Sequence, residues 1–367
     1  MYWEDTLIWP FNKLSSSPLL DEPLRTPKLL GFFSCNKTSE SDVRIQLDAS
    51  NCLYATWKYS NKHYRLDKDL LTYHGSRHCD ENKVIMLKIF GYLRCLITQE
   101  RFFRSSQYKL FDAEIICHIR ILLKLIDAHA DPHEKFTFLC TKFLGNIYIS
   151  QPIGKKKPSC KAERTVFKTV VKSALFADKP DPYAANTKDP FMNRFHGAFK
   201  WSFGDSTVMY FSGISGVENV TEITAESPLN RIKVAVVKIN SSQPNALTQN
   251  SRKIPRWYCH AFLTTSQNIH FVNTDSKTIE AIKTIELDDI RAANEVKWER
   301  TLQERFSFVA MFLNQLRNRL TSTNCPYTVF ELRLDEDYYS HIQCRVHKGF
   351  NRYSFLPQEF INEMSNF

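Results

Sequence analysis

The feature that most constrains the fold is the interleaving of strand-like and helix-like hydrophobic patterns along the 367 residues. Short runs rich in β-branched and aromatic residues predict strands, at 29–33, 52–57, 143–149, 207–212, 234–239, 268–272, 278–284, 327–333 and 341–347. Apolar residues spaced three and four apart predict helices, at 83–100, 112–127, 163–175, 189–201, 255–262, 295–320 and from 357. Because the order is no strict alternation, we expect an α/β (α+β-like) fold, a single large domain with mixed β-sheets flanked by helices.

Two segments are predicted to lie outside the packed core. Residues 1–27 carry a serine run and prolines at 10, 18, 23 and 27, so we expect a flexible N-terminal arm. Residues 28–367 would form the domain, with no linker long enough to separate two cores. Within it, the segment 152–190 carries a lysine run and several prolines, and we expect an exposed loop there around the helix at 163–175.

Charge and cysteine usage suggest an anionic partner and a reducing compartment. The net charge of +10 favours nucleic acid, although a solvated lysine-rich surface explains it equally well. The ten cysteines form no Cys-x-x-Cys pair and no export signal is apparent, which favours free thiols in the nucleus or cytosol. Lys155, Lys156 and Lys157 beside a proline are candidate RNA-binding residues; they also resemble a weak nuclear signal, or a solvated loop. The apolar stretch 115–126 carries three basic residues, so no membrane span is expected.

Motif searches exclude several chemistries and leave one candidate RNA-binding stretch. Walker, dinucleotide-binding, nucleophile-elbow and His-Glu-x-x-His patterns are missing from the sequence. The pairs His74/His78 and His129/His133 have no second half for a zinc site, so no cofactor and no metal are expected. Basic and aromatic residues interleave at 101–111, where Arg101, Arg104 and Lys109 could contact phosphates while the aromatic rings stack on bases. A helix end that packs its aromatic residues inward explains the same stretch.

One strand end departs from the usual chemistry of such positions. The run Phe211-Ser-Gly-Ile-Ser-Gly216 follows an apolar strand and reads as a Gly-x-x-Gly turn. Strand exits of this kind commonly present carboxylates or backbone groups that bind phosphate. Here Ile214 stands between two glycines. Two further segments belong with it, Phe195-His-Gly-Ala-Phe-Lys-Trp201 before it and Ala235-Val-Val-Lys238 after it.

In this order the three segments resemble the DXO-type family of RNA 5′-end quality-control enzymes, which decap and degrade faulty transcripts. In that family a helix carries Gly-x-x-x-Glu, one strand ends in Ser-Gly-Glu-x-Asp, and the next carries Glu-x-Lys. Those carboxylates hold divalent metal ions that orient water and offset phosphate charge. The resemblance spans about 28–362 and includes three further stretches: Leu30-Gly-Phe-Phe-Ser34, Lys142-Phe-Leu-Gly-Asn-Ile-Tyr-Ile149 and Tyr353-Ser-Phe-Leu-Pro357.

The resemblance implies a degenerate former active site. Trp201 stands where the helix glutamate would be, Ile214 and Gly216 replace Glu-x-Asp, and Val236 replaces the acid of Glu-x-Lys. Lys238 remains, and His260 corresponds to a glutamine of the family. With its acids gone, the chain is expected to be a pseudoenzyme with no catalytic residue. An isolated buried ammonium is costly, so we expect Lys238 to contact a phosphate or a substitute carboxylate.

A catalytically inactive member of the family acts at germline piRNA source loci, and this chain resembles it. The resemblance implies a nuclear, chromatin-associated protein, with the cytoplasm open as a second location, that works with Rhino and Deadlock. Its implied role is to protect nascent piRNA-precursor transcripts from 5′-end processing, splicing and termination. Two alternatives stay open. One is a protein-interaction scaffold without RNA binding, and the other is an active decapping and 5′–3′ exoribonuclease whose ligands have moved to Asp205, Glu218 or Glu222.

Overall fold

The fold is described from a computed structural model. The residues it describes are 9–10, 25–37, 43–57, 64–65, 81–98, 109–130, 135–152, 161–181, 183–188, 193–203, 206–240, 253–274, 278–293, 295–334 and 341–366. Most of the predicted arm at 1–27 lies outside them, apart from the residue pair Trp9–Pro10 and the stretch 25–27. Within these residues, none of the helices combines the length and the hydropathy needed to cross a lipid bilayer.

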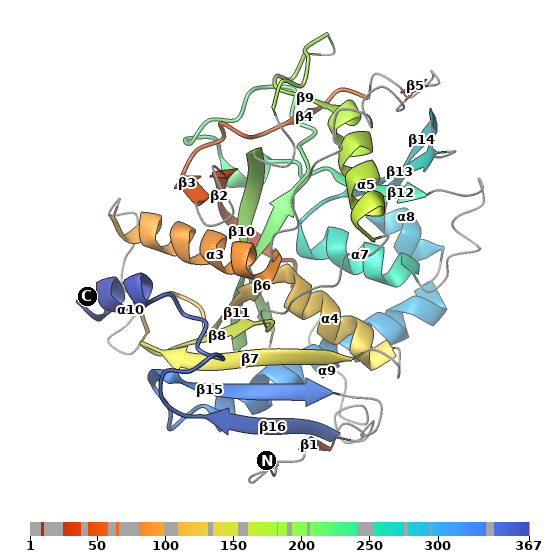
Figure 1. Ribbon diagram of the computed structural model, residues 1–367. Coiled ribbons are helices and arrows are strands. Elements are labelled where there is room, and N and C mark those ends of the chain that lie inside the picture. Colours follow the sequence, from red (N-terminus) through yellow and green to blue (C-terminus); the bar gives the residue numbers. More distant parts are fainter. Residues whose placement is uncertain are drawn as a thin grey trace.

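A mixed sheet runs through the middle of the molecule (Figure 1). In the described residues it has ten strands, in the order β1 (Trp9–Pro10), β16 (His341–His347), β15 (Cys325–Leu334), β7 (Phe136–Phe143), β8 (Asn146–Ser150), β6 (Ile115–His118), β11 (Ser206–Ile214), β10 (Asn193–Phe203), β2 (Lys28–Lys37) and β3 (Val43–Gln46). The central strands β8, β6 and β11 pair in parallel. The other pairs are antiparallel.

Two smaller sheets continue from the end of β11. One has the order β12 (Val236–Asn240), β13 (Asn268–Thr274), β14 (Thr278–Glu286) and β5 (Tyr64–Arg65), and the other pairs β4 (Tyr54–Ala55) with β9 (Phe176–Ala177). Val217 connects the three sheets because it forms bridges with both Tyr54 and Val234. The last residues of β11 therefore lie where all three sheets meet.

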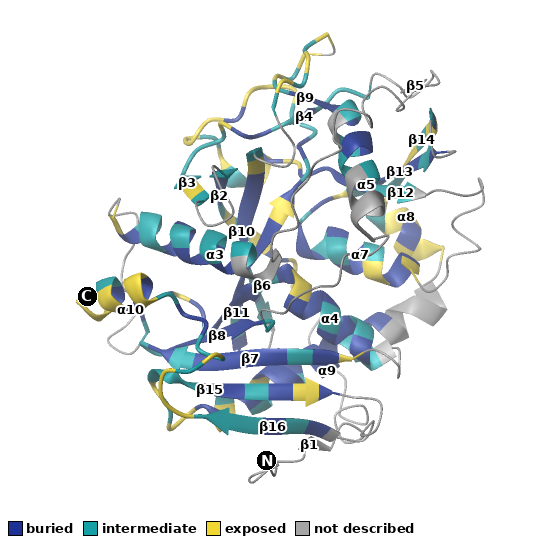
Figure 2. Cartoon of the chain, viewed as in Figure 1, coloured by how far each residue is buried: buried dark blue, intermediate teal, exposed yellow. Residues whose placement is uncertain are grey.

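Helices cover both faces of the main sheet. On one face α3 (Glu81–Thr98) and α10 (Gln358–Ser365) pack with Met209 and Phe211 of β11. On the other face α4 (Ile119–Ala130), α7 (Lys253–Leu263) and α9 (Glu295–Arg319) pack with Val208 and Tyr210. Neighbouring residues of a strand point to opposite faces, so the central strands are buried on both sides (Figure 2). The remaining helices are α5 (Lys161–Leu175), which packs on the second sheet, α8 (Leu287–Ala292) and the short η1 (Leu229–Arg231).

The predicted fold class is confirmed: a single α/β domain with a large mixed sheet flanked by helices. Two local predictions need correction. The segment predicted as a helix at 189–201 is the strand β10, and the predicted helix at 112–127 begins with β6. Both strands are buried on two faces, and a continuous apolar run has no period that separates it from a buried helix. Within 152–190 the helix expected at 163–175 is α5, and Phe176 and Ala177 after it form the buried strand β9.

Candidate phosphate-binding site

The end of β11 brings together three residues of the degenerate site that the sequence predicts. Beyond Ile214 the chain runs beside the segment that leads into β12. Val217 bridges Val234 in antiparallel orientation, and the Ala235 N–H donates to the Gly216 carbonyl at 2.9 Å. With this register Ile214, Gly216 and Val236 lie together. The side chains of Ile214 and Val236 are buried in the large core cluster, at 6% and 4% exposure.

Gly216 has no room for a side chain. A Cβ at this position would overlap the ring of Phe176 and would lie 2.8 Å from the Leu53 carbonyl oxygen. Phe176 is the first residue of β9 and belongs to the third hydrophobic cluster. An aromatic ring therefore occupies the volume next to Gly216.

We expect Gly216→Asp to destabilise the fold by about 1–3 kcal/mol, the usual cost of inserting atoms into a packed region, without creating a metal site. Urea unfolding would measure the loss. The matched control is Gly213→Ala, because a Cβ at Gly213 would come no closer than 3.7 Å to its nearest neighbour, His196 Cε1. An unchanged urea midpoint for Gly216→Asp would contradict this packing.

Two lysines approach the end of β11 from different elements. Lys172, in the last turn of α5, donates from Nζ to Ser215 Oγ at 2.9 Å. Lys238 lies on β12, two residues after Val236. Burial lowers the pKa of Lys172 to about 8 and of Lys238 to about 7, and positive neighbours add to both shifts. For Lys238, Lys172 is the first of those neighbours.

His260 of α7 completes the group, which we call the basic cluster: Lys172, Ser215, Lys238 and His260. Burial lowers the pKa of His260 well below its usual value, and repulsion by Lys238 and Lys172 adds to the shift. Its Nδ1 is buried and has no hydrogen-bond partner among the described residues. The other charged groups that act on the cluster, among the described residues, are also basic, namely Lys168, Arg194 and Arg256. Such a group is complementary to an anion that can accept several hydrogen bonds.

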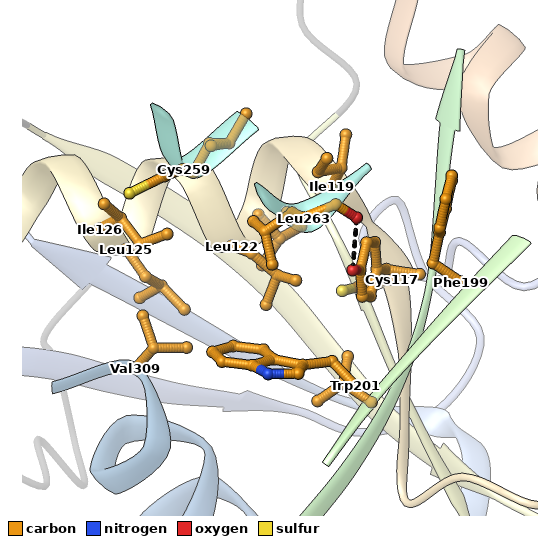
Figure 3. Packing of buried hydrophobic residues seen from close by; sticks show 14 of the residues in the cluster. Cys117, Ile119, Leu122, Leu125, Ile126, Phe199, Trp201, Cys259, Leu263 and Val309 are labelled. Carbon is orange, nitrogen blue, oxygen red and sulfur yellow. Dashed lines mark hydrogen bonds between the residues drawn. The ribbon is translucent and has the colours of Figure 1, made fainter. Parts of the chain in front are cut away.

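Trp201 is not part of this group. It lies on β10 opposite Val208, whereas Ile214 is opposite Phe195, six residues further along the strand pair. Six residues of strand span about 20 Å. The prediction that Trp201 lies on a helix is wrong, because it lies on the strand β10 and far along the strand pair from Ile214. The indole packs in the core with Leu122, Leu125 and Val309 (Figure 3), and its N–H donates to the Arg25 carbonyl at 2.8 Å.

The donor set at the end of β11 does not fit a divalent metal ion. Magnesium and manganese are held by carboxylate, carbonyl and water oxygens, but the side chains that meet here are aliphatic or basic. No group of three or more His, Cys, Asp or Glu that could hold a metal occurs in the described part of the chain. Of the alternative ligands, Glu218 is hydrogen-bonded to His270 Nε2 at 2.8 Å. Glu222 is exposed, and Asp205 lies outside the described residues.

The other candidate RNA-binding residues are mostly not described. Arg101, Arg104 and the run Lys155, Lys156 and Lys157 lie outside the described residues. Lys109 is described, and its Nζ pairs with Glu114 at 3.2 Å. Glu114 is also 3.4 Å from Arg317 Nη1. Lys109 therefore belongs to an ion-pair network and not to the basic cluster.

Comparison with known proteins assigns the family. The model of the RAI1-like PD-(D/E)XK nucleases matches residues 25–361. The chain belongs to this family. A comparison with the sequences of curated proteins finds none that matches. The residues of the basic cluster lie inside the range that the family model matches.

Solved structures show the same fold at low sequence identity. Scheffersomyces stipitis Rai1 is 11% identical, with a TM-score of 0.71 over 100% of both chains. Candida albicans Rai1 in complex with pU5-Mn²⁺ is 8% identical, with a TM-score of 0.67 over 99% of this chain and 100% of that chain. K. lactis Dxo1 in complex with manganese is 12% identical, with a TM-score of 0.58 over 95% and 99%. The chain is therefore similar to Rai1 and Dxo1 in its entire architecture.

Sequence reasoning missed Lys172. The helix at 163–175 was predicted, and α5 (Lys161–Leu175) agrees with it closely. Lys168 and Lys172 lie four residues apart on this helix, so both point to one side. That spacing could indicate a binding site on the helix, but a solvent-exposed stripe of lysines is the commoner explanation. Only the packing of α5 against the end of β11 distinguishes a binding site from an exposed stripe.

Proposed function

We propose that this RAI1-like protein is a non-catalytic member of its family that binds RNA without cleaving it. The proposal is carried by one observation: Lys172 and Lys238 converge where the resemblance to the DXO-type family expects metal-binding acids, and the charged groups that shift their pKa values, among the described residues, are basic. A phosphate group would supply the negative charge that this group lacks. The positive net charge of +10 favours the same class of partner.

The same residues argue against metal-dependent cleavage. A divalent cation would meet two ammonium groups and apolar side chains instead of anionic oxygens, so its binding would be opposed by repulsion. A metal ion lowers the barrier of phosphodiester hydrolysis by several kcal/mol through charge stabilisation and activation of water. At about 1.4 kcal/mol for each factor of ten, loss of this contribution makes turnover negligible.

The finer part of the proposal rests on the sequence resemblance to Cutoff, an inactive member of the family. It assigns the chain to the protection of nascent piRNA-precursor transcripts from 5′-end processing, splicing and termination. It also implies a nuclear location and a complex with Rhino and Deadlock. Co-purification of the three proteins from germline nuclei, with crosslinking of the chain to precursor transcripts, tests this part. Absence of the chain from such complexes would contradict it.

The test of the biochemical proposal combines binding and cleavage. The full chain is incubated with 5′-monophosphorylated pU5 RNA, once in EDTA and once in Mn²⁺. We expect binding in EDTA that weakens steeply as salt rises, and intact RNA in both conditions. Robust Mn²⁺-dependent shortening of the RNA would overturn the proposal. Intact RNA without binding at moderate salt would favour a protein-interaction scaffold.

A further inference from the structure

A second pair of buried basic residues lies beside the basic cluster. Lys88 of α3 places Nζ 3.1 Å from Nε2 of His196 on β10. Burial lowers the pKa of Lys88 to about 8 and that of His196 well below its usual range. His196 is therefore neutral near pH 7, and its Nε2 accepts a hydrogen bond from the Lys88 ammonium. The imidazole stacks on Phe33, with 5.1 Å between ring centroids.

The charges that act on this pair are mainly positive. Among the described residues, the Cys35 thiol raises the pKa of Lys88 and is the strongest of the charged neighbours, whereas Arg194, Lys37 and Arg120 lower it. Lys88 and Arg194 lower the pKa of His196. An ammonium has three N–H donors, and one of them is used by His196. A buried ammonium whose charged neighbours are basic is costly unless an anion joins it.

A solvent-open hollow is lined by Met86, two residues before Lys88 on α3, by His118 at the end of β6, by Arg120 of α4, and by Ser150 and Gln151 at and after the end of β8. Arg194 contributes positive charge at both groups, because it lowers the pKa of Lys88 and His196 and also that of Lys172. The Lys88–His196 pair and the basic cluster therefore share a positively charged neighbour.

Gly213 forms an exposed floor between the two groups (Figure 2 shows the exposed end of β11). It pairs with His196, and a Cβ at Gly213 would lie 3.7 Å from His196 Cε1. Ser215, which accepts from Lys172, follows two residues later, just beyond the end of β11. Two residues of strand span about 7 Å, a separation that neighbouring phosphates of one nucleic-acid strand can bridge.

We propose that Lys88 and His196 form a second phosphate subsite, so that two neighbouring phosphates of one RNA strand bind over Gly213. The basic cluster holds one phosphate and Lys88 holds the next. The inference rests on the proposed RNA binding and extends it, because it makes the preferred ligand an oligonucleotide and not a single terminal phosphate. Neither subsite needs a metal ion, because cationic side chains of the protein bind the phosphates.

The test compares uridine 5′-monophosphate with the dinucleotide pUpU in EDTA. The Lys88→Met variant keeps the length of the side chain and removes its charge. We expect it to bind pUpU about tenfold more weakly than the unsubstituted chain, while its affinity for the mononucleotide changes by less than about twofold. Lys172→Met should weaken the binding of both uridine 5′-monophosphate and pUpU. Lys233→Met is the matched control, since Lys233 is exposed and lies just before β12.

The thermal stability of the Lys88→Met variant distinguishes a ligand-binding role of Lys88 from a structural role. Because Lys88 is buried among positive charges, Lys88→Met should melt at the same or a higher temperature than the unsubstituted chain. If the variant fails to fold, Gly213→Glu replaces it: a carboxylate on the floor should compete with phosphate and weaken pUpU binding. Equal affinity of Lys88→Met and the unsubstituted chain for pUpU would overturn the second subsite but leave the proposed function intact.

A second experiment uses pyrophosphate and does not depend on RNA. It carries two linked phosphates, and its binding is read as a rise in melting temperature. If the unsubstituted chain binds no RNA but pyrophosphate stabilises it more than it stabilises Lys88→Met, the proposed function fails and the paired phosphate site stands. If pyrophosphate stabilises both proteins equally, or neither, and RNA does not bind, both proposals fail.

Discussion

Replacing both Lys172 and Lys238 with methionine should weaken binding of pU5 RNA by about 100-fold or more. A hydrogen bond from a charged donor to a phosphate contributes about 1.5–3 kcal/mol, and 1.4 kcal/mol is a factor of ten in affinity. Two such lysines therefore account for at least two factors of ten. Each phosphate contact to a single strand also contributes about 0.7 to the slope of log affinity against log salt. Fluorescence anisotropy in EDTA at several salt concentrations measures both quantities.

The same double variant should be more stable than the unsubstituted chain, because it removes two buried ammonium groups that repel each other. We expect the free energy of unfolding at pH 7 to rise by roughly 1–3 kcal/mol, the range for relieving a buried polar group without a partner. A gain in stability together with a loss of RNA affinity is the pattern of a ligand site. A structural lysine would show the opposite sign in stability.

The pH dependence of stability has a definite sign. In the folded chain the pKa values are about 8 for Lys172 and about 7 for Lys238, below the 10.5 of an unburied lysine. Between about pH 7 and pH 10 the unfolded chain therefore binds more protons than the folded chain, so the free energy of unfolding rises with pH in this window. The increase should be smaller in the double variant. Urea unfolding at pH 7, 8, 9 and 10 measures it.

Lys233→Met is the control for both measurements because Lys233 is exposed. It removes one positive charge from the same part of the chain, so it reports the effect of net charge alone. The proposal for the basic cluster is contradicted if the double variant binds pU5 as tightly as the Lys233→Met control does. It is equally contradicted if the double variant is the less stable of the two.

Much of the fold could be predicted from the sequence because its patterns are local. The period of apolar residues identified α3, α7 and α9, and β-branched runs identified β12 to β16. The failures at β6 and β10 have one cause. Both lie in the centre of the main sheet, where Ile115, Ile116 and Cys117 are all buried, so the alternation that marks a strand is missing.

The site could be predicted only in part, since its remaining features depend on contacts between distant segments. Lys238 and the apolar Ile214 and Val236 were recognised from an ordered pattern along the chain. Lys172 and Phe176 come from another segment, and only the packing of α5 and β9 brings them to Ser215 and Gly216. The prediction that Trp201 lies on a helix failed because residues 193–203 form the strand β10. The apolar pattern of this segment does not distinguish a buried strand from a buried helix.

Trp201→Ala should destabilise the fold by about 3–5 kcal/mol, the range for truncating a large buried aromatic residue. Trp201 is 1% exposed and makes edge-to-face contacts with Phe262 and Phe306, at centroid distances of 6.4 Å and 5.1 Å. Its N–H also bonds the Arg25 carbonyl, which ties the stretch before β2 to the core. Since a domain of this kind is stable by about 5–15 kcal/mol, the loss is large. Urea unfolding measures it.

The same variant separates two roles for Trp201. If the indole filled a former active-site pocket, its removal would open that pocket and change RNA affinity. Because Trp201 lies about 20 Å along the strand pair from Ile214, we expect folded Trp201→Ala to bind pU5 within twofold of the unsubstituted chain at low temperature. Trp201→Phe is the control, since it keeps most of the ring volume and loses mainly the hydrogen bond, and it should cost only about 1–2 kcal/mol. A large change in RNA affinity for Trp201→Ala, with the affinity of Trp201→Phe unchanged, would show that Trp201 belongs to the binding site.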